Sequence, residues 1–172
     1  MRDHTRSVVY AAVIAAMYAA LTHLQNFLLP GSATWAIQFR AAEALCVLAF
    51  FTPAAIPGLT VGCFVFNLTY GAALPLDILV GSAATALACS AMHLTRRLRF
   101  RGVPVLGLAM PAVWNAFLVG WELTVYIGGG FWLNALYVAL GELAVLFTLG
   151  WLLYSLMLRQ GLVRRLFGKN FD

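Results

Sequence analysis

The sequence contains few charged residues. Only 10% of its 172 residues are Asp, Glu, Lys or Arg, whereas a soluble globular domain carries about 25%. This scarcity of charge excludes an ordinary soluble fold, and a hydrophobic content of 63% indicates an integral membrane protein. About five or six membrane spans would use nearly the whole chain, which leaves no room for a soluble catalytic domain.

The sequence also lacks the motifs of several enzyme and binding-protein classes. Cys46, Cys63 and Cys89 lie in apolar runs without paired spacing, so we interpret them as buried small residues, neither disulfide partners nor metal ligands. The histidines are scattered, and no His/Glu pair has metal-ligand spacing. We therefore expect no metal, no cofactor and no catalytic residue. An intramembrane enzyme and a scaffold without a ligand remain the alternatives from other functional classes.

The basic residues gather beside the apolar segments. The formal net charge is +5, but its placement argues for orientation in a bilayer, not for nucleic-acid binding. The clusters are Arg2 with Arg6, the four arginines within 96–101, and Arg159, Arg164, Arg165 and Lys169 near the C-terminus. Basic loops are enriched on the cytoplasmic side of the plasma membrane. We expect both termini and the 95–102 loop to be cytoplasmic.

The apolar segments predict an all-α membrane protein with a single domain of six transmembrane helices. The expected spans are about 7–29, 37–52, 57–74, 76–94, 104–127 and 131–158. A cleaved signal peptide is the alternative for the first segment, but the apolar run continues past Ala20 and is long enough to span.

The first predicted span carries alanine on two neighbouring ridges with a spacing of four residues. These ridges are Ala11, Ala15 and Ala19, and Ala12, Ala16 and Ala20. Small residues let helix backbones approach closely in lipid. Docking to a separate subunit through Ala11, Ala12, Ala15, Ala16 and Ala19 is one interpretation, and packing inside the bundle is the other.

Polar residues within the predicted spans are the candidates for function. Arg40 and Glu43 are three residues apart, so they share a helix face, and each costs a few kcal/mol at membrane depth unless it is paired or hydrated. A salt bridge is one interpretation, and a polar cavity of substrate size is the other. Further polar residues of the predicted outer half favour the cavity: Asn67, Asp77, Trp121 and Glu122. Glu142 lies about 10 residues, hence about 15 Å, into the last span.

Three sequence blocks carry a resemblance to a known family. The first block is Gln38-Phe39-Arg40-Ala41-Ala42-Glu43-Ala44-Leu45, with Thr52-Pro53-Ala54-Ala55-Ile56-Pro57-Gly58-Leu59 and Gly62-Cys63 with Asn67 after it. The later blocks are Leu76-Asp77-Ile78 with Gly81-Ser82, and Pro111-Ala112-Val113-Trp114-Asn115-Ala116 running to Glu122. Together they resemble the QueT family of queuosine-precursor transporters, over most of the chain from about 36 to 123 and over the alanine ridge of the first predicted span.

The resemblance implies the substrate-binding S component of an energy-coupling factor (ECF) transporter. Such a six-helix subunit binds a vitamin-like solute outside and passes it inward together with a transmembrane coupling subunit and two ATPase subunits. The sequence agrees on one point, because it has no G-x-x-x-x-G-K-[ST] phosphate loop, so any use of ATP must come from partners. An S component for another solute is the alternative within transport.

The implied ligand is a 7-deazaguanine such as 7-aminomethyl-7-deazaguanine or queuine. It offers N–H donors on its pyrimidine edge, and the aminomethyl form adds an ammonium group; carboxylates accept from both. Its flat ring favours aromatic faces, for which Trp35 is a further candidate. The expected substrate-binding residues are Arg40, Glu43, Asn67, Asp77, Trp114, Asn115, Trp121, Glu122 and Glu142. We expect Glu122 and Glu142 to be the strongest ligands; a solvated Glu122 at the interface and a structural hydrogen bond of Glu142 are the alternatives.

The predicted orientation can be tested by labelling. Single cysteines at Ser32 and Gly102, in a Cys-free background, are exposed to an impermeant thiol reagent in intact cells. We expect labelling at position 32 and not at position 102, because the arginines beside Gly102 hold that loop on the cytoplasmic side. Labelling at position 102 but not at position 32 would contradict the orientation and the outward-facing site.

Overall fold

The computed structural model describes residues 2–30, 32, 39–71, 73 and 75–168, and these residues form helices without any named strand. The elements are α1 (Arg2–Leu28), the 3₁₀ helix η1 (Ala41–Phe50), α2 (Ala55–Thr69), α3 (Asp77–Leu94), α4 (Val105–Tyr126), α5 (Phe131–Val145), the π-helix η2 (Leu146–Gly150), α6 (Trp151–Arg159) and α7 (Leu162–Phe167).

Four helices of the described part are long and apolar enough to cross a membrane. They are His4–Leu28, Asp77–Arg97, Val105–Tyr126 and Phe131–Arg159, the last of which joins α5, η2 and α6. The helices η1 and α2 are apolar but shorter. The chain is therefore a multi-pass membrane protein, and the number of six full spans stays a prediction.

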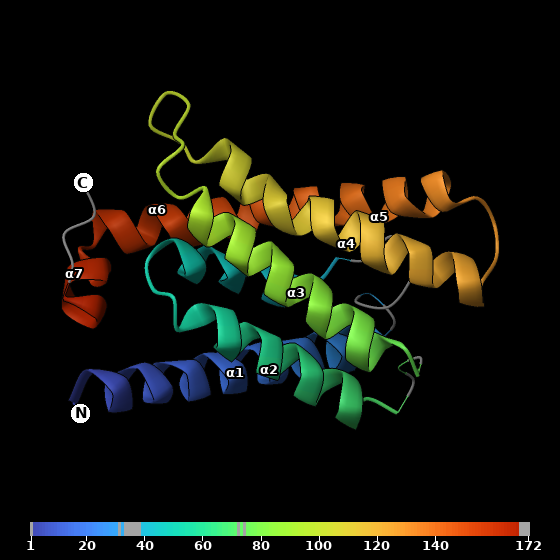
Figure 1. Cartoon of the computed structure of the whole chain (residues 1–172), viewed down its shortest axis with the longest axis horizontal. Coiled ribbons are helices and arrows are strands. Elements are labelled where there is room, and N and C mark those ends of the chain that lie inside the picture. Colours follow the sequence, from blue (N-terminus) through green and yellow to red (C-terminus); the bar gives the residue numbers. More distant parts are fainter. Residues whose placement is uncertain (1, 31, 33–38, 72, 74, 169–172) are drawn as a thin grey trace.

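Successive long helices run in opposite directions between two ends of the molecule (Figure 1). The N-terminus, α7 and the 95–104 connection lie at one end, whereas the 127–130 turn lies at the other (Figure 1). Along the chain, α1 packs on α2, α2 on α3, α3 on α4 and α4 on α5. The start of α1 and the helix α7 thus lie at the same end of the molecule (Figure 1), and the membrane face that they occupy stays a prediction.

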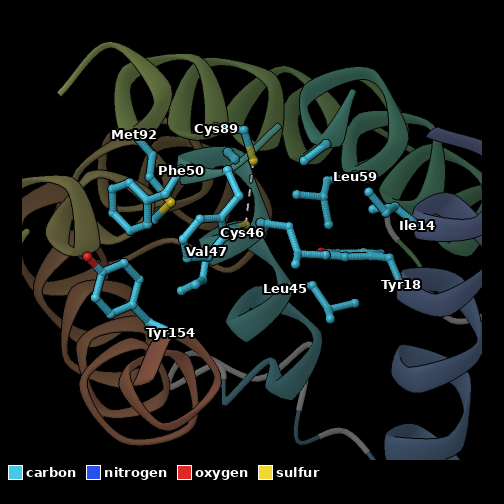
Figure 2. Close-up of a cluster of buried hydrophobic side chains, with 14 of the residues drawn as sticks. Ile14, Tyr18, Leu45, Cys46, Val47, Phe50, Leu59, Cys89, Met92 and Tyr154 are labelled. Atoms are coloured by element: carbon cyan, nitrogen blue, oxygen red, sulfur yellow. Dashed lines mark hydrogen bonds between the residues drawn. The ribbon is translucent and has the colours of Figure 1, made fainter. Parts of the chain in front are cut away.

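The short helix η1 lies at the centre of this arrangement. Its residues 42–50 are all buried, and it contacts every other helix except α7. Figure 2 shows Leu45, Cys46, Val47 and Phe50 surrounded by side chains of other helices. A helix that is apolar on all sides belongs in a core, and after Glu43 this segment has no charged side chain before its end at Phe50.

The prediction of an α-helix over 37–52 differs from the structure. Residues 37 and 38 lie outside the described part, Arg40 is extended (φ −80°, ψ 93°), and the helix begins only at Ala41. A 3₁₀ helix rises about 2.0 Å per residue against about 1.5 Å for an α-helix, so this short segment reaches further through the core. Arg40 and Glu43 therefore do not share an α-helical face, because Arg40 precedes the helix.

Glycines of α2 allow α1 and α2 to approach closely. A Cβ atom added at Gly58 would lie 2.7 Å from the carbonyl oxygen of Ala11, and one added at Gly62 would lie 2.7 Å from that of Ala15. Both neighbours are backbone atoms, which cannot rotate away as a flexible side chain can. The spacing of four residues on both helices is the small-residue packing that membrane helices use.

We expect Gly62→Ala to destabilise the protein by about 1–3 kcal/mol, the usual cost of overpacking. The added methyl group meets Ala15 of α1 at its backbone and Tyr18 at its Cβ atom, 2.8 Å away. Gly130→Ala is the matched control, because nothing lies within 4 Å of a Cβ atom there. Thermal unfolding of the purified protein in detergent measures both variants, and equal midpoints would contradict the close packing of α1 on α2.

Candidate functional site

Four charged side chains are buried within the helical bundle. Arg40 precedes η1, Glu43 lies in the first turn of η1, Glu122 lies on α4 and Glu142 on α5, and none is more than 3% exposed. The polar groups around them come from α1, α2, α3 and α4. The sequence positions are thus far apart, but the fold gathers them at one part of the core.

Glu43 is satisfied by the protein itself. The hydroxyl of Tyr18 donates a hydrogen bond to its Oε1 atom at 2.5 Å, and the thiol of Cys46 donates to its Oε2 atom at 3.0 Å. Cys46 lies one turn of the 3₁₀ helix further along, where side chains three residues apart eclipse one another. Glu43 is therefore held in place by one donor from α1 and one from η1.

Arg40 lies next to a glycine of α3. A Cβ atom added at Gly81 would lie 2.8 Å from Nδ2 of Asn67 and 4.0 Å from a guanidinium nitrogen of Arg40. Glu43 and Glu142 both lie within electrostatic range of the guanidinium group. The absence of a side chain at Gly81 thus leaves room for the amide of Asn67 beside the buried cation, and the two carboxyl groups compensate the charge of Arg40.

Asn67 links the end of α2 to the start of α3. Its Nδ2 atom donates to the backbone carbonyl of Asp77 at 2.7 Å and to the sulfur of Cys63 at 3.6 Å. Asp77 itself is half-buried, and its carboxyl group interacts electrostatically with that of Glu122. The structure therefore brings Asn67 and Asp77 to the edge of the buried charges.

Several buried acceptor atoms have no hydrogen-bond partner within the described part of the chain. Nδ2 of Asn115 donates to Oε1 of Glu142 at 3.1 Å and so joins α4 to α5. Oδ1 of Asn115, Oε2 of Glu142 and both carboxyl oxygens of Glu122 accept no hydrogen bond there. A buried acceptor without a donor costs about 1–3 kcal/mol, so this arrangement suits a bound molecule that supplies donors.

The cluster of buried and half-buried charged residues has a negative net charge when its carboxyl groups are ionised. Four carboxyl groups (Glu43, Asp77, Glu122 and Glu142) face a single arginine among the described residues of the cluster. One cation cannot neutralise four carboxylates, so the cluster favours a ligand that is cationic or rich in N–H groups.

The predicted aromatic ligands have different positions. Trp114 is half-buried on α4, one residue before Asn115. Trp121 is 49% exposed and is therefore not part of the buried cluster, even though Glu122 is. Adjacent residues point about 100° apart around an α-helix, so the side chains of Trp121 and Glu122 leave α4 in different directions. Trp35 lies outside the described residues.

The alanine ridges of α1 separate into an inner and an outer one. Ala11 and Ala15 approach Gly58 and Gly62 of α2, so they take part in packing within the chain. This contact favours the packing interpretation for these two residues, and docking of α1 to a partner stays a prediction. Ala12 and Ala16 are exposed on the surface of α1, whereas Ala19 is half-buried. Only Ala12 and Ala16 remain open for docking among the five predicted positions.

Sequence reasoning missed the polar contribution of α1. Tyr18 bonds to Glu43, and Gln25 bonds to the backbone on either side of Arg40. The signal was present, because Tyr18, Thr22 and Asn26 recur every four residues and all three are buried. A polar stripe on an apolar helix points towards the protein interior.

Comparison with known proteins places these residues in a family. The family described as QueT transporter matches residues 8–159, a range that contains every buried charged residue of the cluster. No curated protein and no solved structure matches the chain. The match covers well over half of the sequence, and the chain therefore belongs to the QueT transporter family.

Proposed function

We propose that this chain is the substrate-binding S component of an ECF-type uptake transporter and that it binds a queuosine precursor. The ligand would be a 7-deazaguanine, such as 7-aminomethyl-7-deazaguanine or queuine. Membership of a transporter family supports transport. One observation supports this class of ligand: Asn115, Glu122 and Glu142 have buried acceptor oxygens that no group of the described chain pairs by a hydrogen bond.

The ligand chemistry complements these acceptors. The pyrimidine edge of a deazaguanine presents neighbouring N–H groups, to which a carboxylate binds in bidentate fashion, and an aminomethyl group presents an ammonium. Glu122 and Glu142 accept these donors, with Asn115, Asn67 and Asp77 as second contacts. Glu43 already accepts two hydrogen bonds from the protein, so its part is to hold Arg40, which donates to the carbonyl oxygen of the ligand.

Transport in this proposal requires partner subunits. The chain has no phosphate-binding loop of the Walker type, so a transmembrane coupling subunit and two ATPase subunits supply the energy. Ala12 and Ala16 form the docking surface on α1, because they are exposed and small enough for close backbone contact. The subunit lies in the plasma membrane with both termini in the cytoplasm, as the basic clusters predict.

The same cluster weighs against the alternatives. A scaffold without a ligand gains nothing from burying a carboxyl group such as Glu142, whose Oε2 atom lacks a donor within the described part. An S component for a different solute fits only if that solute is also cationic or rich in N–H groups. An apolar or anionic solute would leave the buried acceptors unpaired.

We expect Glu142→Gln to weaken binding of 7-aminomethyl-7-deazaguanine by about 10- to 150-fold, which corresponds to the 1.5–3 kcal/mol of a charged hydrogen bond. Calorimetry on the purified, folded protein measures the affinity. Asn134→Ala is the control on the same helix, because Asn134 donates to Thr124 and Gly128 and not to the cluster. If both Glu122→Gln and Glu142→Gln bind like the parent, the site has been placed wrongly.

We expect Ala16→Leu and Ala15→Leu to fail in different ways. Ala16 is exposed, so the larger side chain should leave folding and solute binding intact but prevent assembly with the coupling subunit. Ala15 approaches Gly62 of α2, so leucine there should lower the thermal stability of the isolated subunit. Co-purification with the coupling subunit and a melting curve separate the two effects. Normal assembly and transport by the Ala16→Leu variant would exclude the outer ridge as the docking surface.

A further inference from the structure

We propose that Tyr18 and Gln25 of α1 are positioning residues, which hold Glu43 and Arg40 in the geometry that binds the ligand. Both residues lie within the range of the family match, 8–159, but outside the sequence blocks quoted above for the resemblance. The proposal rests on the proposed function of the same site, and it adds a role for a helix to which the sequence assigned docking or packing within the bundle.

Gln25 fixes the backbone on both sides of Arg40. Its Oε1 atom accepts a hydrogen bond from the backbone N–H of Ala41 at 2.8 Å, and its Nε2 atom donates to the backbone carbonyl of Phe39. The same Nε2 atom donates to the hydroxyl of Ser32 at 2.9 Å. One side-chain amide of α1 therefore holds the residue before Arg40 and the residue after it.

This contact replaces a missing helix cap. The first N–H groups of a helix have no partner within the helix, and the side chain of Arg40 makes no capping hydrogen bond at the start of η1. Gln25 supplies the acceptor for Ala41 from a different helix. Runs of 3₁₀ helix beyond three or four residues are uncommon because their hydrogen bonds are poorly aligned. The start of η1 thus depends on a tertiary contact.

Tyr18 fixes the side chain of Glu43 in a comparable way. Its ring is fully buried near Leu45 and Leu59 (Figure 2), and its hydroxyl donates to Oε1 of Glu43. Tyr18 and Gln25 are seven residues apart, close to two α-helical turns, so they lie on the same side of α1. One face of α1 thereby fixes the position of the Arg40 backbone and the orientation of the Glu43 carboxylate.

A pair of tyrosines on α1 provides the test. Tyr18→Phe removes the donor to Glu43, whereas Tyr10→Phe removes a hydroxyl that donates to the carbonyl of Leu166, in α7. We expect Tyr18→Phe to weaken the affinity for 7-aminomethyl-7-deazaguanine by about 10- to 150-fold, since the lost hydrogen bond is to a charged group. Tyr10→Phe should bind like the parent. Unchanged affinity in Tyr18→Phe, while Glu142→Gln loses binding, would overturn the proposal and leave the proposed function standing.

A double-mutant cycle separates positioning from general stability. If Tyr18 acts through Glu43, then Tyr18→Phe has no further effect on affinity in a Glu43→Leu background, which removes the acceptor of the Tyr18 hydroxyl. Additive losses would show that Tyr18 acts by another route and would overturn its positioning role. Gln25→Met, which keeps the length of the side chain but removes the amide, extends the test to the backbone of Arg40.

Hydrogen exchange of the ligand-free protein gives a readout that does not depend on the substrate assignment. We expect the backbone amides of residues 41–45 to exchange faster in Gln25→Met and in Tyr18→Phe than in the parent and in Tyr10→Phe. Unchanged protection in both variants would overturn the proposal. If the variants exchange faster but the parent protein binds no deazaguanine, the two conclusions separate. The proposed ligand is then refuted, and the role of α1 at the start of η1 is supported.

Discussion

The structure depends on the burial of one positive charge in an apolar bundle. A guanidinium group that is only 3% exposed must be compensated, because an isolated charge in such surroundings costs several kcal/mol. The fold compensates Arg40 with carboxyl groups from separate elements, Glu43 of η1 and Glu142 of α5. The helices that carry these residues are thereby required to meet at one point.

The two ends of η1 have different surroundings, because the charged residues gather at its first turn only. At the Ala41 end, Glu43 accepts hydrogen bonds from Tyr18 and Cys46. At the other end, Phe50 meets Tyr154 edge-on with ring centroids 5.6 Å apart, and Phe51 stacks on the same ring at 5.6 Å. The aromatic end fixes η1 against α6 by packing that needs no polar partner. The polar end of η1 is therefore continuous with an apolar end that packs against α6.

The sequence predicted the charged residues of the site better than their surroundings. Glu122 and Glu142 stand out because carboxyl groups are rare in apolar helices. The sequence could not show that residues 41–50 form a 3₁₀ helix, because 3₁₀ and α-helices both place apolar residues three apart. It therefore could not show that Arg40 precedes the helix with an extended backbone. Tyr18 was overlooked because it stands within the alanine pattern of α1, and that pattern indicated close helix packing, either against a partner or within the bundle. Only tertiary packing shows which ridge of α1 faces inward.

The packing of α1 and the geometry of the site depend on the same contact. A Cβ atom on Gly62 would lie 2.7 Å from the carbonyl oxygen of Ala15 and 2.8 Å from the Cβ atom of Tyr18. The glycine thus sets the distance between α1 and α2 and, at the same time, the position from which the Tyr18 hydroxyl reaches Glu43. Because α1 packs mainly on α2 and η1, a change in the α1–α2 spacing passes directly to Glu43 and, through it, to the environment of Arg40.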